Sequence, residues 1–181
     1  MKERDFDPTQ LDVEAFAKAG VSLESSWPLA QLERLASSVV ALADSDIVAW
    51  HARGEHRPVR GSGHQVWLHV EAKARVMLEC QRCLSPVGAE VAVQRSFMFV
   101  HGENTAAELD NDSEDDVLAL TRSLDLRELI EDELLLALPL VPRHETCPQT
   151  LLVAKPELPA EDDTPHPFAA LAALKRGGLP N

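Results

Sequence analysis

The sequence lacks tyrosine altogether, and its only aromatic side chains are three tryptophans and five phenylalanines among 181 residues. This scarcity argues against a sheet that reads RNA with paired aromatic side chains. The eight glycines are scattered, so no glycine-rich loop for phosphate is visible. No apolar run approaches the roughly 18 residues that a bilayer span needs, and the charged N-terminus has no apolar stretch typical of a signal peptide. These absences predict a cytoplasmic protein with no membrane contact.

Cysteine and net positive charge are scarce as well. The three cysteines are an odd number, which in a reducing compartment favours thiols or metal ligands over a framework of disulfide bonds. The net charge is −13, which argues against a protein that coats nucleic acid with a basic surface. Residues 47–101 are the exception, because they hold seven lysines and arginines against four acidic residues.

Local patterns in the first half of the chain predict two helices followed by a sheet. Asp7 and Pro8 offer an N-cap and a first helical residue, which predicts a helix over about residues 8–19. Apolar residues at every third position predict a second helix from Ser26 to about residue 38. Alternation with a period of two begins at residue 47 and is clearest from Val66 to Leu78. It predicts an antiparallel meander over 47–100.

The second half is predicted to contain a loop, a helix and a tail. Acidic residues crowd into 108–116 and predict a solvated loop over 103–117, and Asp125 caps a helix over 125–138 that Pro139 ends. Prolines then predict a largely disordered acidic tail over 149–181, with a short helical motif at 167–176. The expected fold class is α+β: one domain over 1–148, with N-terminal helices over 8–38 and helices flanking a meander sheet. Because its central strand is long, we expect the sheet to bend, bulge or wrap into a partial barrel.

Two pairs of candidate metal ligands occur at chelating spacing. Cys80 and Cys83 are separated by two residues, and His144 and Cys147 repeat that spacing after the last predicted helix. Together they match a Cys3His set, which is a tetrahedral zinc site. Neither pair is followed by a glycine, so two other interpretations stay open: three ordinary thiols with a loop histidine, or a dithiol redox pair. The redox interpretation is weakened because the CxxC does not open the helix of a βαβ unit.

The solvent side of the predicted sheet carries the residues best suited to contact RNA. A tryptophan there offers a plane on which a base can stack, and the neighbouring cations can meet phosphate. The candidate nucleic-acid-binding residues are Trp67, His69, Lys73, Arg75 and Arg53. The alternative is that these side chains only keep an exposed sheet face soluble.

The helical motif in the tail is a candidate for binding a partner. Its apolar stripe and the cation at its end comprise Phe168, Leu171, Leu174 and Lys175. A helix of about ten residues is marginal on its own in water, so it must fold against something. We expect a partner surface, and the alternative is that the motif docks on the protein's own domain.

Several stretches form a joint pattern from residue 78 onward. They are Leu78–Leu84, Leu124–Leu126, Ile130–Pro142, the pair His144 and Cys147, Pro167–Ala169 and Leu171–Lys175. This pattern resembles the YceD family of bacterial proteins, in the same order and over most of the chain. The resemblance implies a cytosolic factor required for accumulation of large-subunit ribosomal RNA, in its synthesis, processing or stability, with no established catalytic activity.

These observations predict a non-catalytic ribosome biogenesis factor. Its expected partners are ribosomal RNA or a pre-ribosomal particle, together with a ribosomal protein or assembly factor, and zinc is the one cofactor suggested. Two other classes remain: an enzyme, as a thiol oxidoreductase or an RNA-processing enzyme, and an acidic adaptor that binds only proteins.

Overall fold

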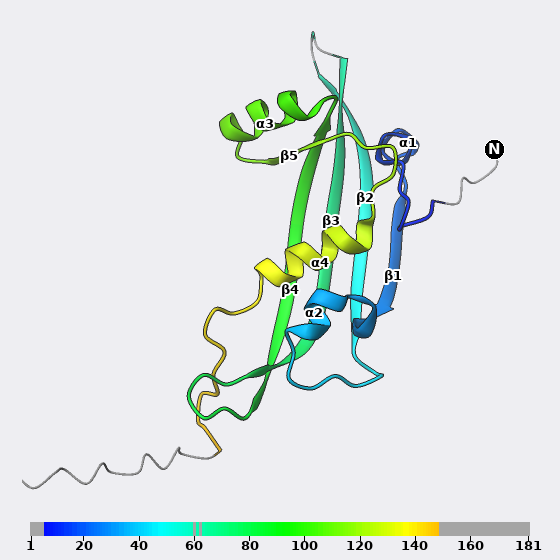
Figure 1. Ribbon diagram of the computed structural model, residues 1–181. Helices are drawn as coiled ribbons and strands as arrows, with labels where there is room; N and C mark the ends of the chain where they lie inside the picture. Colours follow the sequence, from blue (N-terminus) through cyan, green and yellow to red (C-terminus); the bar gives the residue numbers. More distant parts are fainter. Residues whose placement is uncertain (1–5, 60, 62, 149–181) are drawn as a thin grey trace, which may run out of the picture. The chain divides into compact units, whose positions relative to one another are not determined.

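The computed structural model describes residues 6–59, 61 and 63–148, which form a five-stranded sheet with helices (Figure 1). The strands are β1 (Ser22–Pro28), β2 (Ile47–Val59), β3 (Gly63–Glu79), β4 (Pro86–Val100) and β5 (Asp116–Ala119). The helices are α1 (Val13–Ala19), the 3₁₀ turn η1 (Leu29–Gln31), α2 (Glu33–Ser37), α3 (Glu103–Asp112) and α4 (Leu126–Leu136). The strand order follows the chain, and every neighbouring pair is antiparallel except β4 and β5. The α+β class is confirmed.

The main core lies on one face of the sheet, which α1, α2 and α4 cover. In β3 every second residue from Val66 to Leu78 is buried, as expected for a strand with one face in the core. These side chains share one apolar cluster with Phe16 of α1, Leu35 of α2 and Ile130 of α4. The core face predicted for the central strand is therefore correct.

The first predicted helix begins later than expected. Asp12, rather than Asp7, is the N-cap of α1, and its carboxylate accepts a backbone hydrogen bond at 2.9 Å. Leu11 instead pairs with Leu124 through backbone hydrogen bonds in both directions. This pairing ties the N-terminal segment to the start of α4, so the residues before Asp12 cannot continue a helix.

The second predicted helix is wrong over its first half. Residues 22–28 form the edge strand β1, in which Trp27 stacks on Trp50 of β2 with ring centroids 4.5 Å apart. A cross-strand aromatic pair of this kind stabilises a sheet, and the spacing of apolar residues does not reveal it. Only Glu33–Ser37 is α-helical, as α2.

The predicted acidic loop is also wrong, because residues 103–112 form α3 and β5 follows it at Asp116. Gly102 precedes α3 with a φ of 88°, in the left-handed region that glycine adopts readily. Ala106 of α3 packs against Trp67 in a small cluster on the sheet face opposite the main core. The acidic residues of this segment therefore led to the prediction of a loop, whereas the segment forms a helix that covers one end of the sheet face opposite the main core.

The last helix agrees with its prediction, since Asp125 caps α4 by accepting two backbone hydrogen bonds. β3 is 17 residues long, and the sheet is open, with β1 and β5 at its edges. In the described part of the chain, no helix combines the length and apolar character needed to cross a membrane. The tail predicted over 149–181 lies outside the described residues.

Candidate metal centre

The first ligand pair lies in the turn that joins β3 to β4. The Cys80 carbonyl accepts a hydrogen bond from the Leu84 N–H at 2.8 Å, and the Cys80 N–H donates to the Ser85 carbonyl at 3.0 Å. Leu84 has a φ of 61°, in the left-handed region that favours glycine. The turn therefore adopts a conformation suited to glycine although the sequence has none at this position.

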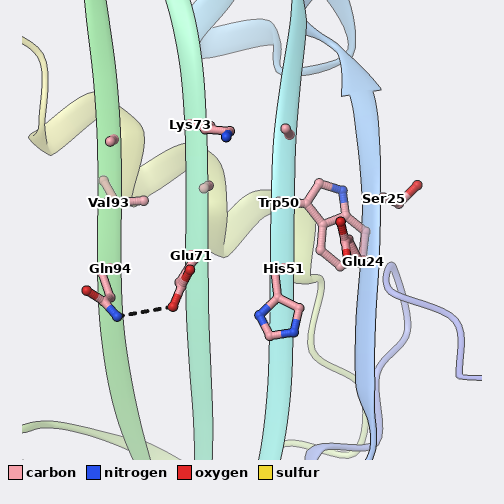
Figure 2. A pocket seen from close by; sticks show the side chains of 11 residues that line it. Glu24, Ser25, Trp50, His51, Glu71, Lys73, Val93 and Gln94 are labelled. Carbon is pink, nitrogen blue, oxygen red and sulfur yellow. Dashed lines mark hydrogen bonds between the residues drawn. The ribbon is translucent and has the colours of Figure 1, made fainter.

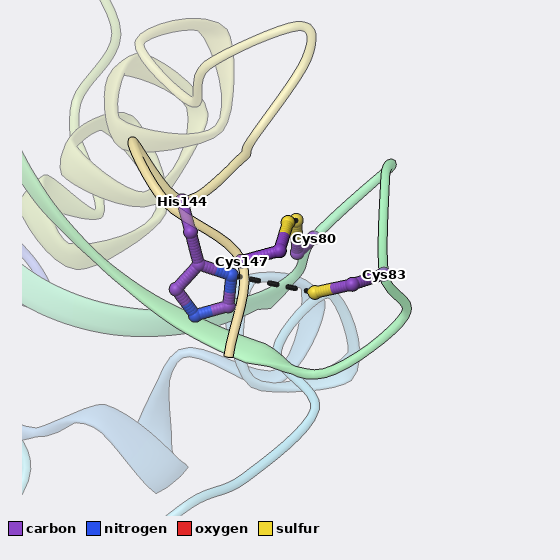
Figure 3. Close-up of side chains that lie close together, drawn as sticks. All are labelled: Cys80, Cys83, His144 and Cys147. Atoms are coloured by element: carbon purple, nitrogen blue, oxygen red, sulfur yellow. Dashed lines mark hydrogen bonds between the residues drawn. The ribbon is translucent and has the colours of Figure 1, made fainter. Parts of the chain in front are cut away.

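The second ligand pair lies in the segment after α4. The Pro142 carbonyl accepts a hydrogen bond from the Gln81 N–H at 2.9 Å, which holds this segment beside the β3–β4 turn. His144 and Cys147 then face the two cysteines of the turn (Figure 3). The two pairs that the sequence separates by 60 residues are thus brought together.

The spacing of the four ligand atoms fits a tetrahedral metal. Cys80 Sγ lies 3.8 Å from Cys147 Sγ, and Cys83 Sγ lies 3.5 Å from His144 Nδ1. Zinc bonds of about 2.3 Å to sulfur and about 2.05 Å to nitrogen separate two sulfurs by about 3.8 Å, and a sulfur from a nitrogen by about 3.6 Å. All four atoms lie within 4.8 Å of one another, so the widest pair has to close by no more than about 1 Å.

The orientation of His144 suits a bond through Nδ1. Its Nε2 lies 3.1 Å from the carbonyl oxygen of Pro86, and that oxygen accepts a hydrogen bond from an Nε2–H. This tautomer leaves the Nδ1 lone pair directed at the sulfur cluster. Proteins commonly orient a histidine ligand through such a bond from its other ring nitrogen to a carbonyl.

The backbone around the turn favours the thiolate form of its cysteines. Burial raises the pKa of Cys80, but backbone N–H groups, that of Arg82 foremost, outweigh it and lower the pKa to about 5. A hydrogen bond from the Ser85 N–H lowers the pKa of Cys83 below its ordinary value. The thiolate is the form of cysteine that binds a metal, so the turn is prepared for this ligand chemistry.

The donor set identifies the kind of site. Three thiols and an imidazole suit zinc and other thiophilic metals, whereas magnesium and calcium prefer oxygen ligands. Four protein ligands complete a tetrahedron, which is the arrangement of structural zinc sites. Within residues 6–148, as far as they are described, this is the one group of three or more histidine, cysteine or acidic side chains close enough to hold a metal. The cluster can bind a metal such as zinc.

The residue predicted to stack on RNA bases is not accessible. Trp67 is only 5% exposed, because it packs with Met98, Ala106 and Val117. The Arg57 guanidinium also lies 4.7 Å from the centroid of its ring. The expectation that Trp67 stands on a solvated face is wrong, since α3 covers it.

Two of the other predicted RNA contacts, His69 and Arg53, lie beside the carboxylate of Glu55. His69 Nε2 lies 2.9 Å from Glu55 Oε2, and Arg53 Nη2 lies 3.6 Å from the same oxygen. Hydrogen bonds, first from Arg57 and then from His69, lower the pKa of Glu55 to about 2. The carboxylate is therefore ionised near neutral pH, and it offsets much of the positive charge beside it.

The remaining two, Arg75 and Lys73, lie further along β3 on the same exposed face. Arg75 Nε is 3.6 Å from Glu90 Oε1, in a pair where both side chains are well exposed. Lys73 has no ion pair among the residues that the structure describes. The face therefore carries less free positive charge than the sequence predicts.

A shallow hollow of about 650 Å³ lies on this face around Lys73 (Figure 2). Lys73 is in register with Ala49 of β2 and Ala92 of β4, so small side chains lie on both sides of it. The next row across the sheet is polar and comprises Glu24, His51, Glu71 and Gln94. The sequence alone does not predict this hollow, because it arises from the register of four strands. The predicted partner residues Phe168, Leu171, Leu174 and Lys175 lie outside the described residues.

Comparisons with known proteins identify the family of the chain. The family model described as large ribosomal RNA subunit accumulation protein YceD matches residues 68–175. The large ribosomal RNA subunit accumulation protein YceD of Haemophilus influenzae is 34% identical over 154 residues, which cover 81% of this chain and 83% of that protein. No solved structure matches. The matched residues span more than half of the sequence and include both ligand pairs, so the chain belongs to the YceD family.

Proposed function

We propose that this protein is a non-catalytic, cytoplasmic factor in biogenesis of the large ribosomal subunit, which supports the synthesis, processing or stability of its ribosomal RNA. The family, named for accumulation of that RNA, supports the process. We further propose that Cys80, Cys83, His144 and Cys147 bind one structural zinc ion. The observation that carries this part is the convergence of four thiol and imidazole ligand atoms within 4.8 Å.

A binding role explains the site better than catalysis does. Four protein ligands leave a tetrahedral zinc no open position for water or substrate. Cys80 and Cys83 lie in a turn between two strands, not at the helix N-terminus where the CxxC of a thioredoxin-like oxidoreductase lies. Burial of Cys80, which is 0% exposed, also keeps its sulfur from a protein substrate. We therefore assign no reaction to these thiols.

The expected macromolecular partner is ribosomal RNA or a pre-ribosomal particle. The exposed sheet face supplies Arg53, His69, Lys73 and Arg75 for phosphate contacts. A second candidate is an adaptor that binds a basic ribosomal protein or assembly factor without touching RNA. Its support is the net charge of −13 together with the burial of Trp67, which removes the stacking plane from the RNA surface.

Metal content and ribosomal RNA levels test the proposed function together. Protein purified without chelator should contain about one zinc per chain, and less than about 0.2 would contradict the metal site. His144→Ala should lose the metal, while His101→Ala, which removes an exposed histidine outside the cluster, should keep it. In a strain that lacks the gene, wild type and His101→Ala should restore the ratio of large- to small-subunit ribosomal RNA. Failure of the wild-type protein to restore that ratio would contradict the proposed role.

The identity of the partner is tested by purifying tagged protein from cells, with RNA sequencing and mass spectrometry of the material bound. The RNA interpretation expects Lys73→Glu combined with Arg75→Glu to release the RNA. It also expects Lys18→Glu, a charge reversal on α1, to retain it. The adaptor interpretation instead expects a basic protein that stays bound to both variants after nuclease treatment.

A further inference from the structure

Arg82 lies between Gln81 and Cys83 in the turn. Its side chain contacts the opposite ligand pair, His144 and Cys147. Its Nε donates to Cys147 Sγ at 2.9 Å. Its Nη2 donates to the carbonyl oxygens of His144 at 2.9 Å and Glu145 at 3.1 Å. One guanidinium group thus bonds to one ligand atom and to the backbone that carries both ligands.

These contacts matter because, apart from the hydrogen bond between His144 Nε2 and the Pro86 carbonyl, little else holds the second ligand pair. The segment before it buries few apolar atoms, since Leu140 is 98% exposed and Val141 is 60% exposed. Its other backbone anchor on the turn is the hydrogen bond from the Gln81 N–H to the Pro142 carbonyl. Without hydrophobic burial, a segment of this kind opens easily, so hydrogen bonds from the planar guanidinium of Arg82 restrict it where packing does not.

The charge of the site gives Arg82 a second role. Three thiolates around a divalent ion leave a net charge of −1, and a guanidinium at 2.9 Å from one sulfur offsets it. Burial raises the pKa of Cys147, and hydrogen bonding from Arg82 acts against that increase. A neutral glutamine or a serine at position 82 would supply no such balance.

We propose that Arg82 is a positioning residue of the metal centre: it holds His144 and Cys147 against the turn before a metal binds, and it neutralises the excess charge once the metal is bound. This proposal rests on the proposed zinc site. In this arrangement the CxxC turn carries two ligands, Cys80 and Cys83, and also carries Arg82, which holds the other two ligands. Metal binding then requires less ordering of the chain, which raises affinity.

Zinc affinity and hydrogen exchange of the full-length protein test this role. Affinity is measured by competition with a chromophoric chelator, and exchange is followed in residues 142–148 of the zinc-free protein. The variants are Arg82→Gln, which removes the charge and the guanidinium fork but keeps an amide donor, and Arg82→Lys, which keeps the charge. Arg143→Gln is the control, because Arg143 lines a small hollow together with Arg82 and His144 but, within the described residues, makes no hydrogen bond to the ligand pair.

Arg82→Gln should weaken zinc binding about 10- to 100-fold, as loss of an outer contact to a metal ligand usually does. It should also speed exchange in residues 142–148 while the urea midpoint of the zinc-free sheet stays unchanged. Arg82→Lys should fall between it and the wild type, and Arg143→Gln should stay within about threefold of the wild type. Equal zinc affinity of Arg82→Gln and the wild type would overturn the role of Arg82 alone. A wild-type protein that binds no zinc would overturn the site and this role together.

Discussion

Replacing Glu131 should test how firmly α4 is held, because this carboxylate joins α4 to α2. Glu131 is only 7% exposed. Its Oε1 accepts hydrogen bonds from the backbone N–H of Arg34 at 2.7 Å and of Leu35 at 3.0 Å. Its Oε2 accepts from the Arg34 side chain at 3.0 Å and 3.1 Å. Since α2 has no side-chain cap of its own, the carboxylate of a residue 97 positions away caps it.

The structure sets the size of the expected effect. Loss of a capping carboxylate lowers stability by about 1 kcal/mol, and the buried N–H of Leu35 left without a partner adds about 1–3 kcal/mol. Arg34 contributes less than a fully buried partner would, because its side chain is 48% exposed and water can replace the lost pair. We therefore expect Glu131→Ala to lower the free energy of unfolding by about 3 kcal/mol. Glu131→Gln, which retains an acceptor for the backbone, should lower it by about half as much.

Urea denaturation of the full-length protein measures these changes, and Asp132→Ala is the matched control. Asp132 pairs with the same Arg34 guanidinium, but its side chain is 48% exposed. Exposed ion pairs contribute about 0–1 kcal/mol, so this variant should stay within about 1 kcal/mol of the wild type. The reasoning fails if Glu131→Ala and Asp132→Ala lower the stability equally, because burial and capping would then have no separate effect.

Two further predictions concern backbone positions. Gly54→Ala should lower the stability of the protein by about 2 kcal/mol or more in urea denaturation, because an added Cβ would lie 2.8 Å from the Ala17 backbone of α1. Gly88→Ala is the control and should change the stability little, because the nearest neighbour of its added Cβ is a flexible Arg75 atom at 3.4 Å. Equal losses in the two variants would contradict the steric argument. Leu84→Gly should stabilise the zinc-bound protein by about 1 kcal/mol, because the φ of 61° favours glycine over leucine. Since the leucine side chain is 58% exposed, its removal loses little packing. An unchanged or lower melting temperature would show that the turn is not strained.

The sequence predicts the sheet well because one physical signal dominates it. The alternation of buried and exposed residues from Val66 to Leu78 is a direct result of one face packing in the core, so periodicity alone identifies the strand. Residues 22–28 lack that signal, since β1 is an edge strand and most of its residues are exposed. Its Trp27 stacks on Trp50, which lies 23 residues further along the chain in β2.

Long-range packing also explains the errors at α3 and Trp67. The acidic residues of 103–117 suggest a solvated loop, but only one of the ten α3 residues, Ala106, has to be buried for the helix to dock. A helix with so small an apolar face has almost no amphipathic pattern to detect. The same docking buries Trp67, so the wrong loop and the wrong stacking residue have one cause.

The sequence predicts the candidate ligands of the metal centre, but it does not predict the groups that hold those ligands in place. Spacing alone marks Cys80, Cys83, His144 and Cys147 as candidate ligands, because two residues between ligands permit chelation wherever the segment lies, but it leaves ordinary thiols or a redox pair as alternatives. No spacing rule assigns Arg82 or the Pro86 carbonyl, since each acts on residues about 60 positions away. Their roles follow from the path of the chain after α4.

That path links the proposed metal centre to the rest of the domain. Glu131 fixes α4 against α2, and α4 ends eight residues before His144. The β3–β4 turn, which carries the other two ligands, joins the two longest strands of the sheet, which pair along their length. A zinc ion bound by both pairs would close a loop between α4 and the sheet. Its binding energy would therefore stabilise the position of that loop rather than the packing of the core. Metal loss is therefore expected to loosen residues 139–148, which hydrogen bonds from Arg82 and the Gln81 N–H still hold to the turn, while the sheet stays folded.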